Sequence, residues 1–200
     1  MPAPARVPRP VTAVLVVLAL VAATVAAVRL LRPRENVYVL GDSMTFLAKD
    51  QISAEAHDAG FSVTVDGIPG IRLATRMPAI GLLGHRTSGP LVIELGTNDV
   101  DSGTPADELA NRIDQAVGLV ATLPCVVFVG VGILYDNDGR AHGFNEHLAA
   151  VVQAHPNLHV FDWESEYRQH PDWSLDTVHL KPEHYTDYAK GIIDTVKKDC

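Results

Sequence analysis

Five short, mainly apolar segments that alternate with helical segments restrict the fold of this chain more than any other feature. A strand that is apolar along its whole length is typical of a parallel sheet that helices cover on both faces. The alternation of such strands with helices is the pattern of the α/β class. We therefore predict β-strands over residues 37–40, 61–65, 91–95, 125–131 and 158–161.

The segments between these strands carry helix signals. The clearest begins at Thr104, a hydroxyl residue suited to cap a helix, which is followed by Pro105 and by two acidic residues in the first turn. Because crossovers between parallel strands are right-handed, few topologies remain. We expect a three-layer α/β/α sandwich with a flavodoxin-like five-stranded parallel sheet in the order 2-1-3-4-5. Helices are predicted over residues 43–59, the second half of 66–84, 104–122, 141–154 and 183–198.

The first 34 residues differ in composition from the rest. They contain five arginines and no acidic residue, and residues 11–28 form a run of 18 apolar or weakly polar residues. Eighteen residues is at the short end of what spans a bilayer. We predict that residues 1–34 are a membrane anchor with one transmembrane helix and a linker, and that residues 35–200 are a single domain. A signal peptide cleaved near residues 25–27 is the alternative.

The rest of the chain is acidic. The sequence has 16 basic and 24 acidic residues, and because five of the basic residues lie in the first 34 positions, the remaining part has a formal net charge of −13. Such a domain is a poor candidate for binding nucleic acid, because phosphates favour Lys and Arg. We expect no nucleic-acid partner, no preference for anionic substrates, and a monomeric or weakly associating chain.

Polar motifs follow four of the five predicted strands. The sequence GDS at 41–43 follows the first strand, and a glycine at 70 within DGIPG follows the second. GTND at 96–99 follows the third strand, and DTVH at 176–179 follows the fifth after a long loop. The carboxyl ends of parallel strands share one edge of a sheet, which is where ligands bind in such folds. All four motifs should therefore lie on that edge, with the first and third as neighbours.

Three of these residues have the chemistry of a nucleophilic catalyst. A serine hydroxyl is a poor nucleophile unless a base takes its proton. His179 can be that base for Ser43, and Asp176 can orient the imidazole ring and stabilise its protonated form. The backbone N–H groups of Ser43 and Gly70 and the side-chain amide of Asn98 can bind the oxyanion that forms in acyl transfer.

Each of these residues also has a structural interpretation. Ser43 can cap the helix that follows it, and Gly70 and Asn98 can belong to turns. Asp176 and His179 can be surface residues, although their pairing just before the last helix favours the catalytic interpretation.

Other polar residues are expected to be structural. Asp42 and Asp99 are expected to hold the turns in which they lie. The remaining eight histidines show no metal-ligand spacing supported by cysteine or acidic clusters, so no metal site is predicted.

Four motifs resemble, in the same order, the four blocks of the SGNH hydrolases, the GDSL esterase/lipase family. They are GDS, the glycine of DGIPG, GTND and DTVH. The resemblance covers about residues 36–198. It implies that Ser43 is the nucleophile, that Asp176 and His179 complete a triad, and that Ser43, Gly70 and Asn98 form the oxyanion hole. It also implies no metal and no organic cofactor. The chain has no G-x-S-x-G motif, which disfavours the α/β-hydrolase fold.

Two positions depart from the family pattern. Leu180 follows His179 where the family often has Pro, and the glycine that is usual early in the last helix is replaced around His184. Neither touches the expected chemistry, but both can reshape the pocket rim. Four further residues on loops near this edge either line a pocket or pack the loops: Tyr135, Asn137, Trp163 and Trp173.

The resemblance implies a serine esterase that acts on O-acyl esters through an acyl-enzyme intermediate. We expect short acyl groups on envelope glycans or lipids, because the sequence has no long hydrophobic lid segment. An acyltransferase that uses a sugar hydroxyl as acceptor is an alternative, and so is a non-catalytic, membrane-tethered glycan-binding module. Similarity to anchored envelope enzymes places the domain outside the cytoplasm at the cell membrane. Secretion after signal cleavage and exposure to the cytoplasm are the alternatives.

The two cysteines are expected to pair. Cys125 begins the fourth predicted strand, at the edge of the sheet opposite the polar motifs. The last helix starts at the polar edge and runs back for roughly 24 Å at 1.5 Å per residue, so Cys200 should end near Cys125. We predict a disulfide between them, which would favour an oxidising compartment.

Overall fold

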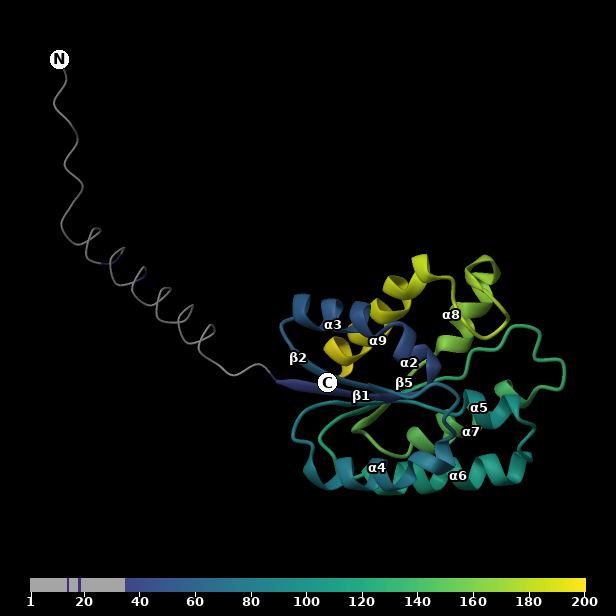
Figure 1. Cartoon of the computed structure of the whole chain (residues 1–200). Helices are drawn as coiled ribbons and strands as arrows, with labels where there is room; N and C mark the ends of the chain where they lie inside the picture. Colours follow the sequence, from purple (N-terminus) through teal and green to yellow (C-terminus); the bar gives the residue numbers. More distant parts are fainter. Residues whose placement is uncertain (1–13, 15–17, 19–34) are drawn as a thin grey trace, which may run out of the picture. The chain divides into compact units, whose positions relative to one another are not determined.

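A five-stranded parallel sheet forms the centre of the domain, with the strand order β2-β1-β3-β4-β5 (Figure 1). All four pairs of neighbouring strands are parallel in this computed structural model. The predicted α/β class and strand order are confirmed. The strands are β1 Asn36–Gly41, β2 Ser62–Gly67, β3 Leu91–Glu94, β4 Val126–Val129 and β5 Leu158–Phe161.

Helices cover both faces of the sheet, as Figure 1 shows. One face carries α4 Leu73–Arg86, α5 Thr97–Asp101, α6 Ala106–Val120 and α7 Arg140–Val152. The other face carries α2 Ser43–Leu47, α3 Lys49–Asp58, α8 Trp163–Gln169 and α9 Tyr185–Asp199. Two short 3₁₀ helices, η1 Pro171–Trp173 and η2 Pro182–His184, lie between α8 and α9.

The strands supply side chains alternately to two hydrophobic cores. Leu40 and Ile93 pack in one core with residues of α4, α6 and α7. Val39 and Val92, their neighbours in sequence, pack in the other core with residues of α3 and α9. Every residue of β3 and β4 is buried, as expected for central strands covered on both faces. Each large aliphatic side chain buried in this way contributes about 1.5–3 kcal/mol.

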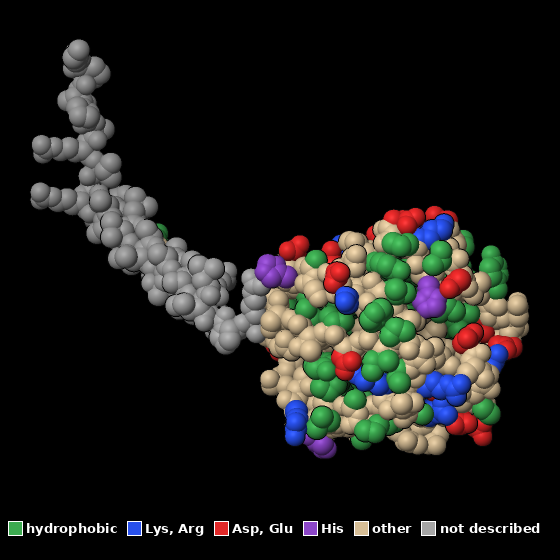
Figure 2. Space-filling model, viewed as in Figure 1, with side chains coloured by type: hydrophobic (Ala, Val, Ile, Leu, Met, Phe, Trp, Pro, Cys, Tyr) green, Lys and Arg blue, Asp and Glu red, His purple; other side chains and the backbone are tan. Residues whose placement is uncertain are grey.

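The structure describes residues 14, 18 and 35–200. Residues 35–200 form one compact unit. Apart from residues 14 and 18, the predicted anchor and the alternative cleavage site lie outside the described residues. Within the described residues, no helix has the length and apolar character needed to cross a bilayer. On the face of the domain drawn in Figure 2, acidic and basic side chains are interspersed among hydrophobic ones and form no large basic patch.

Some predicted helices differ from those observed. The helix predicted over 43–59 is two helices, α2 and α3, which meet at Ala48. Helix α6 starts at Ala106, two residues after the expected cap, and Thr104 is buried ahead of it. The short helices α5 and α8 were not predicted, because five to seven residues are too few to show a helical period.

A disulfide closes the edge of the sheet away from the polar motifs. Cys125 directly precedes β4 and Cys200 follows α9, and they are bonded with 5.6 Å between their Cα atoms. This is the pairing that the topology predicts. The cross-link spans 75 residues of sequence, so it stabilises the fold by about 4 kcal/mol in the chain-entropy model.

Replacement of both Cys125 and Cys200 by Ser is expected to lower the melting temperature by about 10 °C, because the unfolded chain regains its loop entropy. The ester turnover that the resemblance implies should not change in the folded variant, because the disulfide lies at the opposite edge from the polar motifs. Differential scanning fluorimetry with and without reductant measures the first effect. Two thiols that react with iodoacetamide in unfolded, unreduced wild-type protein would contradict the cross-link.

Candidate active site

The predicted triad residues meet at the carboxyl edge of the sheet. Ser43 is the first residue of α2, one residue after the end of β1, and Asp176 and His179 lie in the loop between η1 and η2. The Oγ atom of Ser43 lies 2.8 Å from Nε2 of His179. The other ring nitrogen, Nδ1, lies 2.9 Å and 3.1 Å from the two carboxylate oxygens of Asp176. The three side chains therefore form a continuous hydrogen-bonded chain.

A tight loop positions the acid and the base. Asp176 Oδ1 accepts the backbone N–H groups of Val178, at 3.2 Å, and of His179, at 2.8 Å. Leu175 N–H donates to the carbonyl oxygen of His179 and closes the loop. Partial burial tends to raise the pKa of the Asp176 carboxyl, but the hydrogen bonds from the His179 backbone and ring and from Val178 lower it below its usual value. An ionised Asp176 can thus hold the His179 ring in orientation.

The turn that carries Ser43 is held from two sides. Asp42 caps α2 by accepting the Met44 N–H at 3.0 Å. Glu94, the last residue of β3, lies beneath the turn, and its Oε2 accepts the N–H groups of Asp42 and Thr45 at 3.1 Å and 3.2 Å. The Thr45 hydroxyl donates to the same oxygen at 2.9 Å. Within the described chain, Ser43 N–H is left as the donor of this first turn without an acceptor.

The glycine of the GDS motif is required by this close packing. A Cβ atom at Gly41 would lie 1.9 Å from the Thr45 hydroxyl oxygen and 2.7 Å from Glu94 Oε2. A Cβ atom at Gly67, at the end of β2, would lie 2.4 Å from the backbone nitrogen of Phe46. The first turn of α2 therefore sits directly on the ends of β1 and β2.

Glu94 and Asp42 are buried carboxyl groups side by side. Burial raises the pKa of Glu94 well above its usual value, and the Asp42 charge raises it further. Burial also raises the pKa of Asp42, to about 6, although its hydrogen bonds to Met44, Glu94 and Asn98 oppose this. The pair therefore tends to keep a proton. Glu94 was not among the predicted site residues; the signal for it was one acidic residue in an otherwise apolar strand.

The predicted oxyanion donors differ in whether their N–H groups already have hydrogen-bond acceptors in the structure. Gly70 has a left-handed φ of 73°, no atom lies within 4 Å of the place where its Cβ would be, and its N–H donates to no acceptor among residues 35–200. The Asn98 amide nitrogen instead donates to Asp42 Oδ2 at 3.0 Å and to the carbonyl oxygen of Ile71 at 3.1 Å. Both of its N–H groups are thus engaged, and Asn98 has to exchange one partner to bind an oxyanion.

Other residues of the motifs pack as structural elements. Asp99 Oδ2 accepts the Leu73 N–H at 2.7 Å, and the other carboxylate oxygen pairs with Arg112. These two contacts tie the start of α4 and the middle of α6 to the GTND motif, in line with the expected structural role of Asp99. Leu180 is fully buried in the core beside α9.

The aromatic residues near this edge divide into packed and exposed ones. Trp163 is buried and stacks on Tyr167 in the core. Trp173 stacks between His170 and His184, with ring centroids 3.9 Å and 4.8 Å away. Trp163 therefore packs in the core, whereas Tyr135 is exposed.

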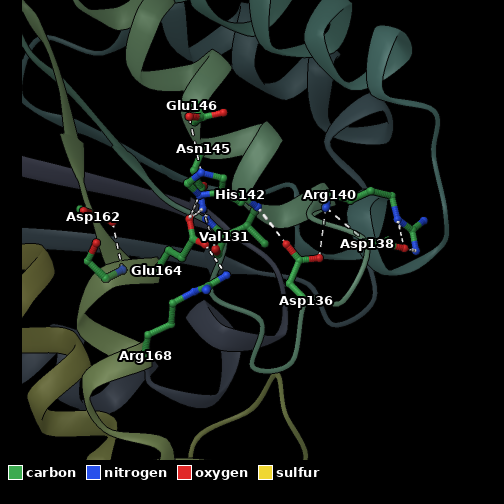
Figure 3. Close-up of polar contacts among 11 residues, drawn as sticks. Val131, Asp136, Asp138, Arg140, His142, Asn145, Glu146, Asp162, Glu164 and Arg168 are labelled. Atoms are coloured by element: carbon green, nitrogen blue, oxygen red, sulfur yellow. Dashed lines mark hydrogen bonds and ion pairs between the residues drawn. The ribbon is translucent and has the colours of Figure 1, made fainter.

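A second polar cluster lies at the β4 and β5 end of the same edge (Figure 3). Asn145 on α7 exchanges two hydrogen bonds with the backbone of Val131, at 2.7 Å and 2.8 Å, and donates to Glu164 of α8 at 2.8 Å. Arg168 lies 2.7 Å from the second oxygen of Glu164. A cavity of about 440 Å³ opens beside these residues. Since these groups bond mainly to one another, the cluster fixes the chain that follows β4.

Comparisons with known proteins agree with this architecture. No family model matches the chain. Among curated proteins, it is 24% identical over 170 residues to the "Putative peptidoglycan O-acetyltransferase YrhL" of Bacillus subtilis, a match that covers 82% of this chain and 24% of that protein. The chain thus spans about a quarter of the length of this relative.

Several solved structures share the fold. A lipolytic protein of the G-D-S-L family from Veillonella parvula superposes with a TM-score of 0.69 at 18% identity, covering 80% of this chain and 97% of that one. The C-terminal catalytic domain of peptidoglycan O-acetyltransferase A from Streptococcus pneumoniae gives 0.66 at 14% identity, with coverages of 83% and 92%. An acetyl xylan esterase from Geobacillus stearothermophilus gives 0.66 at 12%, with coverages of 81% and 94%. The resemblance predicted from the four motifs is confirmed at the level of the fold.

Substitution of Glu94 should show how much its hydrogen bonds to the Ser43 turn stabilise the fold. Glu94→Ala leaves the N–H and the hydroxyl of Thr45 without an acceptor, while the Asp42 N–H keeps the backbone carbonyl oxygen at position 94, 3.2 Å away. The substitution is expected to lower the free energy of unfolding by about 3 kcal/mol at pH 7. Glu94→Gln keeps an acceptor oxygen and should lose less. Urea unfolding measures both, with Glu146→Ala, at an exposed carboxylate on α7, as the matched control. Equal losses in Glu94→Ala and the control would show that Glu94 does not support the turn.

The same variants test the proton held by the Asp42–Glu94 pair. Between about pH 4 and pH 6 the native state binds more protons than the unfolded state, because the native pKa values are raised. The free energy of unfolding of the wild type should therefore fall as the pH rises through this range. In Glu94→Gln the fall should be smaller, and an identical pH profile would contradict the shared proton.

Proposed function

We propose that this protein is a serine esterase that acts on O-acyl esters through an acyl-enzyme intermediate. The observation that carries the proposal is the contact of 2.8 Å between Ser43 Oγ and His179 Nε2, with the opposite ring nitrogen held by Asp176. A hydroxyl, a base and an orienting acid in this order are the parts that activate a serine. The fold shared with esterases and an O-acetyltransferase domain supports the same chemistry.

In the first half of the reaction, Ser43 Oγ attacks the ester carbonyl carbon and its proton passes to Nε2 of His179. The negative oxygen of the tetrahedral intermediate is bound by the N–H groups of Ser43 and Gly70. Asn98 adds its amide when it exchanges one of its present partners. His179 then protonates the oxygen of the leaving alcohol, the bond between carbonyl carbon and alcohol breaks, and the acyl group stays on Ser43.

In the second half, a new hydroxyl group attacks the acyl carbon. His179 takes the proton of that hydroxyl, and Ser43 leaves and regains a proton from His179. If the acceptor is water the reaction is hydrolysis, and if it is a sugar hydroxyl the reaction is acyl transfer. The transferase is the second candidate, favoured by the names of the curated relative and of the pneumococcal structure.

The substrate class we propose is a short acyl ester of an envelope glycan. Relatives and neighbours are named for acetyl xylan and for peptidoglycan, which are both glycans that carry acetyl esters. An acyl ester of a lipid is the alternative. The acidic domain argues against nucleic acid as a ligand, and no metal or organic cofactor enters these steps.

We further propose that the domain lies outside the cytoplasm. The apolar run at 11–28 would anchor it to the cell membrane or, if cleaved, lead to its secretion. The bond between Cys125 and Cys200 supports an oxidising compartment. A reporter enzyme that is active only after export, fused at the C-terminus, tests this placement: a fusion that is stably produced but shows no reporter activity would contradict it.

Ser43→Ala should abolish labelling by a fluorophosphonate probe and reduce ester turnover by at least about 10³-fold, because no other group supplies the nucleophile. Asp176→Asn should lower kcat by roughly 10⁴-fold with little change in KM. Ser165→Ala, at an exposed serine on α8, is the matched control and should behave as the wild type. Folded wild-type protein that neither reacts with the probe nor turns over acyl esters would favour a glycan-binding module.

The choice between hydrolase and transferase should appear in the products. With an aryl acetate as donor, a transferase should release the aryl alcohol faster when neutral oligosaccharides are added and should yield acetylated saccharide. A hydrolase should release acetate at a rate that does not depend on the saccharide. Mass spectrometry of the saccharide, with Ser43→Ala as blank, distinguishes the two.

A further inference from the structure

Tyr135 is displayed to solvent beside the triad. With 76% of its surface exposed, it is the most exposed large hydrophobic residue of the described chain. Its backbone has a φ of 61°, in the left-handed region that bulky residues rarely adopt. Burial does not hold the ring there, and the backbone conformation is unfavourable. Such strain is found where a structure holds a residue for a function.

The loop that carries Tyr135 is bonded to the loop of the triad. Leu134 N–H donates to the carbonyl oxygen of Thr177 at 2.8 Å, and Thr177 lies in sequence between Asp176 and His179. Thr177 also has a left-handed backbone, with a φ of 82°. These are the two non-glycine residues with positive φ in the described part, and they lie next to the same hydrogen bond. The position of Tyr135 is thus coupled directly to the loop that holds the acid and the base.

A cavity of about 400 Å³ lies between these two loops and α5, a volume within the range of small-ligand sites. Because α5 also carries Asn98, the cavity borders the segments that supply both the base and an oxyanion donor. The residues of its wall that matter here are Asp101, Tyr135, Asn137, Arg140 and Thr177.

Two carboxylates of this wall already have local partners (Figure 3). Asp136 accepts the backbone N–H groups of Arg140 and His142, each at 3.1 Å, and so holds the start of α7. Asp138 pairs with the Arg140 guanidinium at 2.7 Å and neutralises it. These contacts fix the loop and leave no free cation in the described wall.

Three side chains of the wall stay available to bind a ligand: the ring of Tyr135, the amide of Asn137 and the carboxylate of Asp101. The side chains of Asn137 and Asp101 make no hydrogen bond or ion pair with the residues that the structure describes, and the Tyr135 ring is exposed. An apolar face with adjacent donors and acceptors matches a pyranose ring, which has a C–H face and a rim of hydroxyls. With three aspartates and one arginine, the wall is negatively charged, which disfavours anionic sugars.

We infer that this cavity binds a neutral or amino sugar ring of the acyl-bearing or acyl-accepting glycan, with the ring stacked on Tyr135. This inference rests on the proposed esterase or transferase function and names the part of the substrate that the site recognises. Tyr135 binds the alcohol part of the ester and takes no part in proton transfer.

Kinetics with two acetate esters test this role. Tyr135→Ala should raise KM for acetylated xylotetraose about tenfold, which corresponds to about 1.4 kcal/mol of lost stacking, and leave kcat within about twofold. Turnover of ethyl acetate, which has no sugar, should not change. Tyr135→Trp should restore the wild-type KM, and Leu82→Ala, at an exposed hydrophobic residue on α4, is the matched control. Equal losses on both esters, or no loss on either, would overturn the inference.

A binding measurement tests the sugar site without requiring that the protein turns over an ester. Ser43→Ala protein is titrated by calorimetry with the neutral tetrasaccharides of xylose and of N-acetylglucosamine and with tetragalacturonate. The inference predicts that at least one neutral saccharide binds and that tetragalacturonate binds more weakly than this saccharide. The double variant Ser43→Ala, Tyr135→Ala should bind the neutral saccharide about tenfold more weakly. Absence of binding to both neutral saccharides, or binding that is insensitive to Tyr135, overturns it. If the wild type turns over no ester but this binding pattern holds, the proposed chemistry fails and the sugar site stands.

Discussion

The buried carboxylate of Glu94 is the contact on which the geometry of the candidate site depends. A buried carboxyl group costs a few kcal/mol unless it is hydrogen-bonded, and here one of its oxygens accepts three hydrogen bonds from the turn of Ser43. Two of these bonds satisfy the N–H and the hydroxyl of Thr45, which would otherwise lack partners. They also bring the turn so close to β1 that only glycine fits at position 41. The direction of the Ser43 hydroxyl thus follows from an acid at the end of the neighbouring strand.

The fold was predictable because its signals are long and repeated. Parallel strands covered on both faces are apolar along their length, and β1 lies between β2 and β3 as the predicted strand order requires. The same logic placed Cys125 and Cys200 at the edge opposite the triad. The break at Ala48 and the short helices α5 and α8 were not predictable, because single turns are stabilised by tertiary contacts such as the Glu94 bonds to Thr45.

The site was predictable in its residues and less so in its bonding. The order of strands brings Ser43, Asp176 and His179 together, since each follows a strand end on one edge. Sequence order says nothing about side-chain partners across strands, so the two bonds of the Asn98 amide and the position of Glu94 appear only in the structure. The same limit applied to the aromatic residues: Trp163 and Tyr135 both lie near the edge, but one is in the core and the other is exposed.

Two buried carboxyl groups directly beneath the proposed nucleophile oppose its reaction if both are ionised, because attack creates a negative oxygen nearby. The strength of this repulsion depends on how much negative charge Asp42 and Glu94 carry. Burial raises the pKa of both Asp42 and Glu94, so the pair tends to hold a proton and carries less than two full charges. Asp42 also accepts the Asn98 amide. In the proposed mechanism Asn98 turns to the oxyanion, and Asp42 loses a hydrogen bond that lowers its pKa, which favours its protonated form and lowers the negative charge beside the oxyanion.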